Sequence, residues 1–108
     1  MTHIELANES NEWSIECKGH AGYASVGNDI VCAAISTLTQ TLIEYLLEQD
    51  IEVSYHANNG YLWIYCDDPK SQVARDVIVS GLKLVAMSYN QYIKIVEGCP
   101  INRKFPLQ

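Results

Sequence analysis

A cysteine and a histidine lie close together in the first third of this chain, in a pattern that suits nucleophilic catalysis. His20 belongs to a segment that contains Gly19, Gly22 and Gly27, and Cys32 follows at the start of an apolar run. A cysteine in the first turn of a helix lies near backbone N–H groups and the positive end of the helix dipole, which both favour the reactive thiolate. A histidine on the adjoining loop could take the proton of the thiol. The spacing therefore permits a catalytic cysteine–histidine pair.

Each of these residues also has a structural interpretation. Most free cysteines are small buried hydrophobic residues, and Cys32 could be one of them. A single loop histidine such as His20 is commonly a solvated side chain. Asp29 is suited to cap the helix and could also orient the histidine. Cys17, His20 and Cys32 could instead bind zinc, but no clear fourth ligand lies nearby, and we expect no metal or other cofactor.

The loop that contains His20 has the composition of a segment that turns tightly or closes over an extended peptide. Backbone N–H groups at the start of the helix, over residues 27–32, could hold the oxyanion of an acyl-transfer reaction. The loop lacks the lysine and the glycine spacing of phosphate-binding loops. Its composition therefore favours peptide chemistry over nucleotide binding.

The hydrophobic pattern indicates the elements that must position these residues. Period-2 alternation predicts strands over residues 3–7, 12–18, 51–56, 61–66 and 93–97. Longer apolar-periodic stretches predict helices over about 29–49 and 67–90. The order β-β-α-β-β-α, with a final strand, predicts a two-layer α+β domain in which two helices cover an antiparallel sheet of about four to five strands. We expect one domain over residues 1–97 and a C-terminal tail over 98–108.

Several predicted elements are apolar on more than one face. The N-terminal half of the first helix is apolar nearly all round, which predicts burial by the sheet or by a second subunit. Strand 61–66 is apolar on both faces, which is typical of a central strand or of an interface. On the second helix we expect burial of Val73, Val77, Ile78, Leu84 and Val85.

Composition limits the classes of partner. The 108 residues include 7 Lys and Arg and 13 Asp and Glu, for a net charge of −6. An acidic chain without a basic cluster is a poor candidate for binding nucleic acid or anionic lipid, and is better suited to a basic partner. The N-terminus lacks signal-peptide features, and no apolar run looks long enough to span a bilayer. We therefore expect a cytoplasmic protein without membrane contact, whose four cysteines are reduced.

The segment 19–36 resembles a known signature. It reads GHAGYASVGNDIVCAAIS and matches the pattern GHAxYAxxGxDIVCAAxS without a gap. This pattern is similar to that of the Prp family, the ribosomal-processing cysteine proteases of certain bacteria. The predicted order of elements over residues 1–97 also resembles the small α+β fold of that family.

The resemblance implies a cysteine endopeptidase that removes the N-terminal extension from the precursor of a large-subunit ribosomal protein and exposes its basic N-terminus. Cys32 would be the nucleophile and His20 the general base and then acid, while Asp29 and Ser36 would be orienting or structural residues. The family resemblance also implies a homodimer. Two alternatives stay open, namely a ribosome-assembly protein that binds the same partner without cutting it and a small zinc-binding module.

Overall fold

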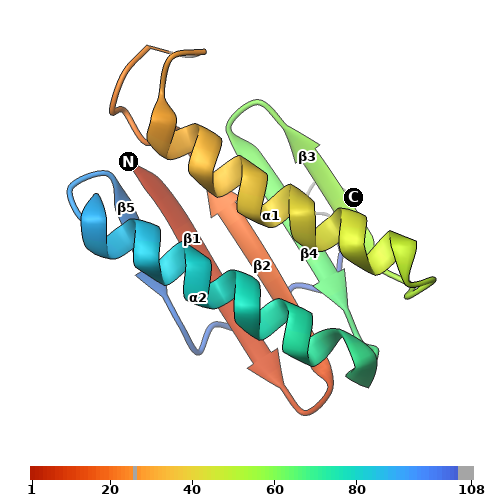
Figure 1. The fold of residues 1–108 in the computed structure, drawn as a ribbon. Coiled ribbons are helices and arrows are strands. Elements are labelled where there is room, and N and C mark those ends of the chain that lie inside the picture. The colour runs from red at the N-terminus through yellow and green to blue at the C-terminus, as the bar shows by residue number, and fades with distance from the viewer. Residues whose placement is uncertain (26, 105–108) are drawn as a thin grey trace.

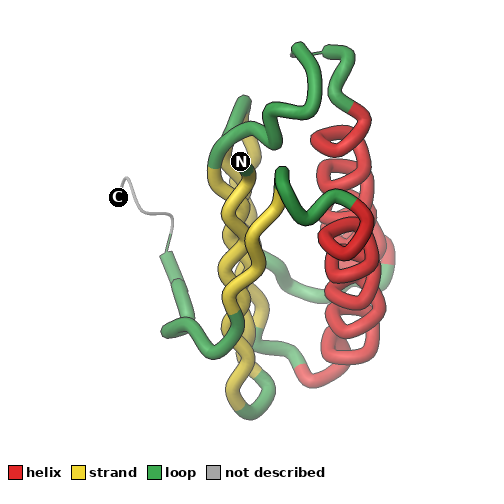
Figure 2. Tube along the Cα trace, turned by 90° about the vertical axis from the view of Figure 1, so that its left-hand side faces the viewer, coloured by secondary structure: helices red, strands yellow, loops and turns green. Residues whose placement is uncertain are grey.

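The structure is a computed structural model that describes residues 1–25 and 27–104. The elements follow the chain as β1 (Thr2–Glu9), β2 (Glu12–Lys18), α1 (Ile30–Glu48), β3 (Ser54–Asn58), β4 (Tyr61–Cys66), the 3₁₀ turn η1 (Pro69–Ser71), α2 (Gln72–Ser88) and β5 (Ile93–Val96). Both helices lie on one face of the sheet, and the two layers are separate when viewed edge-on (Figures 1 and 2). The predicted two-layer α+β class is confirmed.

The sheet has the strand order β3-β4-β2-β1-β5. All neighbouring strands are antiparallel except β1 and β5, which pair in parallel with Thr2 opposite Ile93. The expected wholly antiparallel sheet is therefore a mixed one. The reason is the direction of α2. This helix runs the length of the helical layer and returns the chain to the end of the sheet at which β1 begins, so β5 starts beside the start of β1. There the N–H of Thr2 donates to the carbonyl of Tyr92 over 2.9 Å.

One stripe of α1 packs on the sheet. The buried residues recur every three or four positions, as expected for a helix with one covered face, and are Val31, Ile35, Thr39, Leu42, Ile43 and Leu46. By length and composition alone α1 could also cross a membrane, contrary to the expectation that no apolar segment is long enough. The core helix of a compact domain passes the same test, and α1 contributes this stripe to the core.

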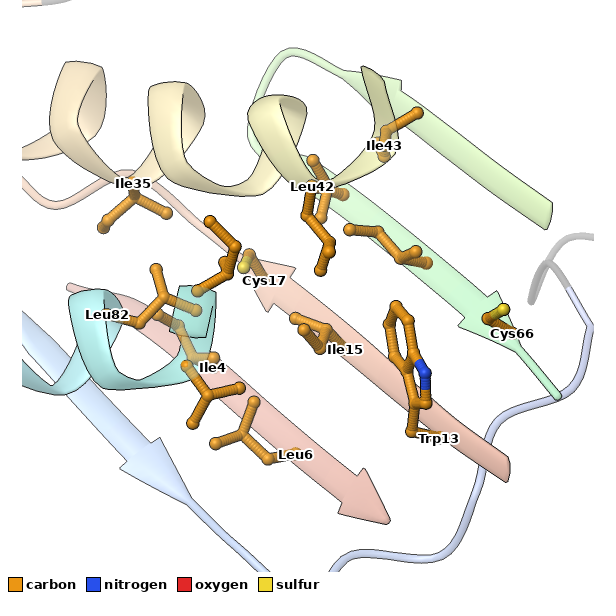
Figure 3. Packing of buried hydrophobic residues seen from close by; sticks show 14 of the residues in the cluster. Ile4, Leu6, Trp13, Ile15, Cys17, Ile35, Leu42, Ile43, Cys66 and Leu82 are labelled. Carbon is orange, nitrogen blue, oxygen red and sulfur yellow. The ribbon is translucent and has the colours of Figure 1, made fainter. Parts of the chain in front are cut away.

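The core fills the space between the helices and the inner face of the sheet (Figure 3). Ile4 and Leu6 of β1 and Ile15 of β2 point toward Leu42 of α1 and Leu82 of α2. Burying each such side chain contributes roughly 1.5–3 kcal/mol to folding. This layer of side chains holds the start of α1 at a fixed place relative to the strands.

The outward face of α2 differs from the prediction. Ile78 is buried and Val85 half-buried as expected, but Val73, Val77 and Leu84 are 76%, 63% and 64% exposed. The predicted burial of these three residues is therefore wrong. The helix carries apolar residues on two faces, and the sheet covers only the face that holds Ile78, Val79 and Leu82.

The C-terminal segment covers the outer face of the sheet, opposite the helices (Figure 2). The N–H of Cys99 donates to the carbonyl of Leu6 over 3.1 Å, and the N–H of Asn102 donates to Oγ of Ser14 over 3.0 Å. The indole N–H of Trp63 donates to the carbonyl of Asn102 over 2.9 Å. The second apolar face of β4 is thus covered by the chain itself. On the edge of the sheet, β3 begins at Ser54 rather than at the predicted residue 51.

Candidate active site

A cavity of about 320 Å³ lies between the start of α1 and the turn that joins β3 to β4. Both features are at the same end of the molecule (Figure 1). The cavity is lined by the loop before α1, the first three turns of α1 and the hairpin turn 57–61. It brings together six of the seven residues predicted for the site, namely Gly19, His20, Gly27, Asp29, Cys32 and Ser36. Gly22 is not among its lining residues.

Cys32 is the third residue of α1 and is partly exposed to this cavity. Its Sγ accepts a hydrogen bond of 3.3 Å from the backbone N–H of Ala21. The residue that follows His20 in the chain therefore contacts the sulfur directly through its backbone.

Asp29 joins the loop to the helix. Its Oδ1 accepts from the N–H groups of Val31 and Cys32, both over 2.9 Å, so Asp29 is the N-cap of α1 as the sequence predicts. Its Oδ2 accepts from the N–H groups of Tyr23 and Ala24 over 2.9 and 3.1 Å. Burial alone would raise the pKa of Asp29, but these four hydrogen bonds hold the pKa below its usual value. The carboxylate is therefore ionised and fixes the shape of the loop.

The role of Asp29 limits where an oxyanion can bind. The N–H groups of Val31 and Cys32 are occupied by the carboxylate, and that of Asn28 donates to the carbonyl of Ser25 over 2.9 Å. We expected backbone N–H groups over residues 27–32 to hold the oxyanion. The N–H groups of Asn28, Val31 and Cys32 are not free to do so. Among the described residues, the four hydrogen bonds of the carboxylate all come from backbone N–H groups and none comes from the His20 imidazole.

His20 is exposed at the rim of the cavity. Its Nε2 edge faces Gly60, because a Cβ built on Gly60 would lie 3.1 Å from Nε2. Within the described part of the chain, His20 and Cys32 line one cavity but share no hydrogen bond. Catalytic hydrogen bonds are often long in a free enzyme and tighten when substrate binds.

Two parts of the site were not predicted as such. Tyr23 packs edge-to-face on Tyr89 and Tyr92, with ring centroids 5.6 and 5.3 Å apart, and so attaches the loop to the end of α2. The turn 58–60 forms the cavity wall opposite α1. Tyr23 belongs to the signature segment, so the sequence does mark this residue as part of the site. For the turn 58–60, the sequence predicts a connection between two strands and gives no sign that it lines the site.

The other cysteines are placed differently from Cys32. Cys17 touches the cavity but is 6% exposed, and burial raises the pKa of its thiol to about 12. Cys66 is buried, and Cys99 lies on the segment that covers the outer face of the sheet. Over the described residues, no group of three or more His, Cys, Asp or Glu side chains is placed to hold a metal ion. The zinc-site alternative of Cys17, His20 and Cys32 therefore has no geometric support.

Comparison with known proteins identifies the family. Residues 1–94 match the family model described as cysteine protease Prp. The chain belongs to the Prp family of cysteine proteases. The ribosomal processing cysteine protease Prp of Mycoplasma genitalium is 37% identical over 82 residues, which cover 74% of this chain and 83% of that protein. The Prp of Mycoplasma pneumoniae is 29% identical over 85 residues, which cover 77% of this chain and 85% of that protein.

Solved structures have the same fold. A crystal structure of the essential ribosomal processing protease Prp from S. aureus, in complex with a covalently linked product peptide, aligns with a TM-score of 0.81 at 19% identity and covers 90% of this chain and 99% of that one. A crystal structure from Streptococcus mutans aligns with a TM-score of 0.75 at 28% identity and covers 90% of this chain and 93% of that one. The fold of the chain thus agrees with its membership of the Prp family of cysteine proteases.

Proposed function

We propose that this Prp chain is the endopeptidase that removes the N-terminal extension from the precursor of a large-subunit ribosomal protein, with Cys32 as nucleophile and His20 as general base and acid. The observation that carries the proposal is that Cys32 and His20 line the same cavity, while the N–H of Ala21 donates to Sγ of Cys32. The related S. aureus Prp, described in complex with a covalently linked product peptide and with a substrate peptide, supports peptide cleavage at this site.

The surroundings of the four cysteines favour Cys32 as the nucleophile. Cys17 and Cys66 are buried, and burial holds the Cys17 thiol in its protonated form because the pKa rises to about 12. Cys99 lies beyond residues 1–94, which match the family. Of the three histidines, His20 lines the cavity, whereas His3 lies in β1 and His56 in β3. Cys32 and His20 are therefore the pair that a peptide in the cavity would meet.

The reaction then follows ordinary thiol-protease chemistry. His20 takes the proton of Cys32, and Sγ attacks the scissile carbonyl carbon to form a tetrahedral intermediate. The C–N bond breaks as His20 gives its proton to the leaving amine, which is the new N-terminus of the ribosomal protein. Water, deprotonated by His20, then hydrolyses the thioester and releases the extension with a free carboxylate. The N–H of Ala21 lies 3.3 Å from Sγ and is therefore near the tetrahedral carbon that is bonded to Sγ and bears the oxyanion.

Charge and surface support the partner assignments. The net charge of −6 favours a partner that is basic beyond the cleavage point. A homodimer is supported by the outward stripe of α2, where Val73, Val77, Leu84 and Met87 are 76%, 63%, 64% and 77% exposed. Large apolar stripes of this kind are typical of protein interfaces. The protein acts in the cytoplasm, where ribosomal proteins are assembled, and needs no cofactor.

The proposal is tested by incubating the purified chain with the ribosomal protein precursor from the same organism and measuring intact masses. A single new product that lacks its N-terminal extension supports the endopeptidase. A precursor that binds tightly but stays uncut would contradict it and favour an assembly protein of the same fold. A product cut at many sites would contradict the proposed specificity.

A further inference from the structure

The turn between β3 and β4 contacts the proposed general base at Gly60. A Cβ built on Gly60 would lie 3.1 Å from Nε2 of His20 and 3.6 Å from both Cδ2 and Cε1. The tip of the imidazole thus faces the bare Cα of this residue. A contact of 3.1 Å is tighter than nine in ten real Cβ contacts, so any side chain here would displace the ring by a few tenths of an ångström.

The same residue also holds the backbone next to His20. The N–H of Gly19 donates to the carbonyl of Gly60 over 2.8 Å. Gly60 therefore fixes both the chain that enters the loop and the side chain of the residue that follows. It has a φ of +83°, a conformation that glycine adopts readily and that residues with a Cβ rarely adopt.

We propose that Gly60 is a positioning residue for His20, and that the β3–β4 turn sets where the imidazole stands relative to Cys32. The turn can do this because β4 pairs with β2 in the interior of the sheet and so fixes the turn, while His20 stands on a loop rather than on a strand or helix. The catalytic role of His20 that this inference assumes rests on the proposed function.

The matched variants are Gly60→Ala and Gly98→Ala. Gly98 has a similar φ of +74°, but a Cβ there would meet nothing within 4 Å. Both substitutions introduce the same kind of backbone strain, and only the first places a methyl group against His20. Gly60→Asn is a third variant, because asparagine tolerates positive φ better than alanine and still carries the Cβ.

Steady-state cleavage of the precursor gives the first readout. In Gly60→Ala and Gly60→Asn we expect kcat to fall by about 10- to 100-fold with KM changed by less than about threefold, because a small misplacement of a catalytic group mainly slows the chemical step. Gly98→Ala keeps the wild-type kcat. Thermal unfolding of each variant identifies any loss that comes from a smaller folded population.

NMR of the three histidine side chains gives a second readout that does not depend on activity. The His20 ring resonances shift in both Gly60 variants and stay in place in Gly98→Ala. A folded Gly60→Ala variant with the wild-type kcat and unshifted His20 resonances would overturn the inference. Equal losses of kcat in the Gly60 and Gly98 variants would overturn it as well. If the wild-type chain leaves the precursor uncut, the proposed function fails, while the His20 resonances still decide whether Gly60 positions the ring.

Discussion

The backbone N–H of Ala21 donates a hydrogen bond of 3.3 Å to Sγ of Cys32. This contact joins the loop that bears His20 to the first turn of α1, and it places a donor beside the atom that would carry an acyl group. The loop is held in this position from the other side by Asp29, whose carboxylate accepts from both the loop and the helix. The site is therefore a junction between two segments rather than a feature of the helix alone.

Removal of the Asp29 carboxylate should weaken this junction. The Asp29→Ala variant loses an N-cap and two loop hydrogen bonds, and we expect a loss of about 1–2 kcal/mol in the free energy of unfolding, typical of N-cap removal. The cleavage rate should fall by more than the loss of folded protein alone would cause, because the freed loop also carries His20. Urea unfolding and cleavage rates measure the two effects. An Asp29→Ala variant as stable and active as the wild type would show that the carboxylate does not hold the loop.

A buried hydrogen bond connects the core to the start of α2. The indole N–H of Trp13 donates to Oγ of Ser71 over 2.7 Å, and that hydroxyl donates to the carbonyl of Asp68 over 2.6 Å. In Ser71→Ala the buried indole N–H loses its acceptor, which should cost about 1–3 kcal/mol in the free energy of unfolding. Ser80→Ala on the exposed face of α2 is the control. Equal urea midpoints for the two variants would contradict this prediction.

The ion pair between Glu12 and Arg103 should make attachment of the C-terminal segment depend on pH. Hydrogen bonds from Arg103 and from the Tyr65 hydroxyl lower the pKa of Glu12 below its usual value of 4.5. A carboxylate with a lowered pKa stabilises the folded state above its unfolded pKa, and this contribution is lost as the pH falls through the folded value. Arg103→Ala should therefore lower the urea midpoint slightly at pH 7 and by less at pH 3, where more of Glu12 is protonated.

The control for this pair is Lys104→Ala, a nearby exposed cation that is in none of the salt bridges found among the described residues. It should leave the urea midpoint unchanged at both pH values. A difference between Arg103→Ala and the wild type that persists undiminished at pH 3 would mean that the pair with Glu12 is not its source.

The exposed stripe of α2 predicts a change in oligomeric state on mutation. Leu84→Glu places a charge within the stripe and should convert a dimer to a monomer in size-exclusion chromatography with light scattering, because burying an unpaired charge is unfavourable. Gln49→Glu makes the same charge change at the exposed end of α1 and should leave the mass unchanged. A wild-type chain that is monomeric at all concentrations would contradict the proposed homodimer.

Local patterns predicted most of the elements. Strand β4 was predicted at its observed bounds because both its faces are apolar and a turn and a proline delimit it, and Asp29 marked the start of α1. The parallel pairing of β5 could not be predicted, because it depends on the path of α2 across the helical layer. Burial on α2 was mispredicted because two of its faces are apolar and the sequence does not say which one meets the sheet.

The site was predictable only within the signature segment. The closeness of His20 and Cys32 follows from a short loop that runs into a helix, and both line one cavity. The occupation of the helix-end N–H groups by Asp29 was missed, although an N-cap carboxylate implies it. The contact of Gly60 with His20 joins residues far apart in sequence, and it depends on the pairing of β4 with β2.

The most direct test of the central claim compares precursor cleavage by the wild type, Cys32→Ala and Cys99→Ala. If Cys32 is the nucleophile, Cys32→Ala forms no product while Cys99→Ala, which removes the other partly exposed thiol, cuts at the wild-type rate and site. Product formed by folded Cys32→Ala at the wild-type site would contradict the assignment and leave Cys32 as a packing residue at the start of α1.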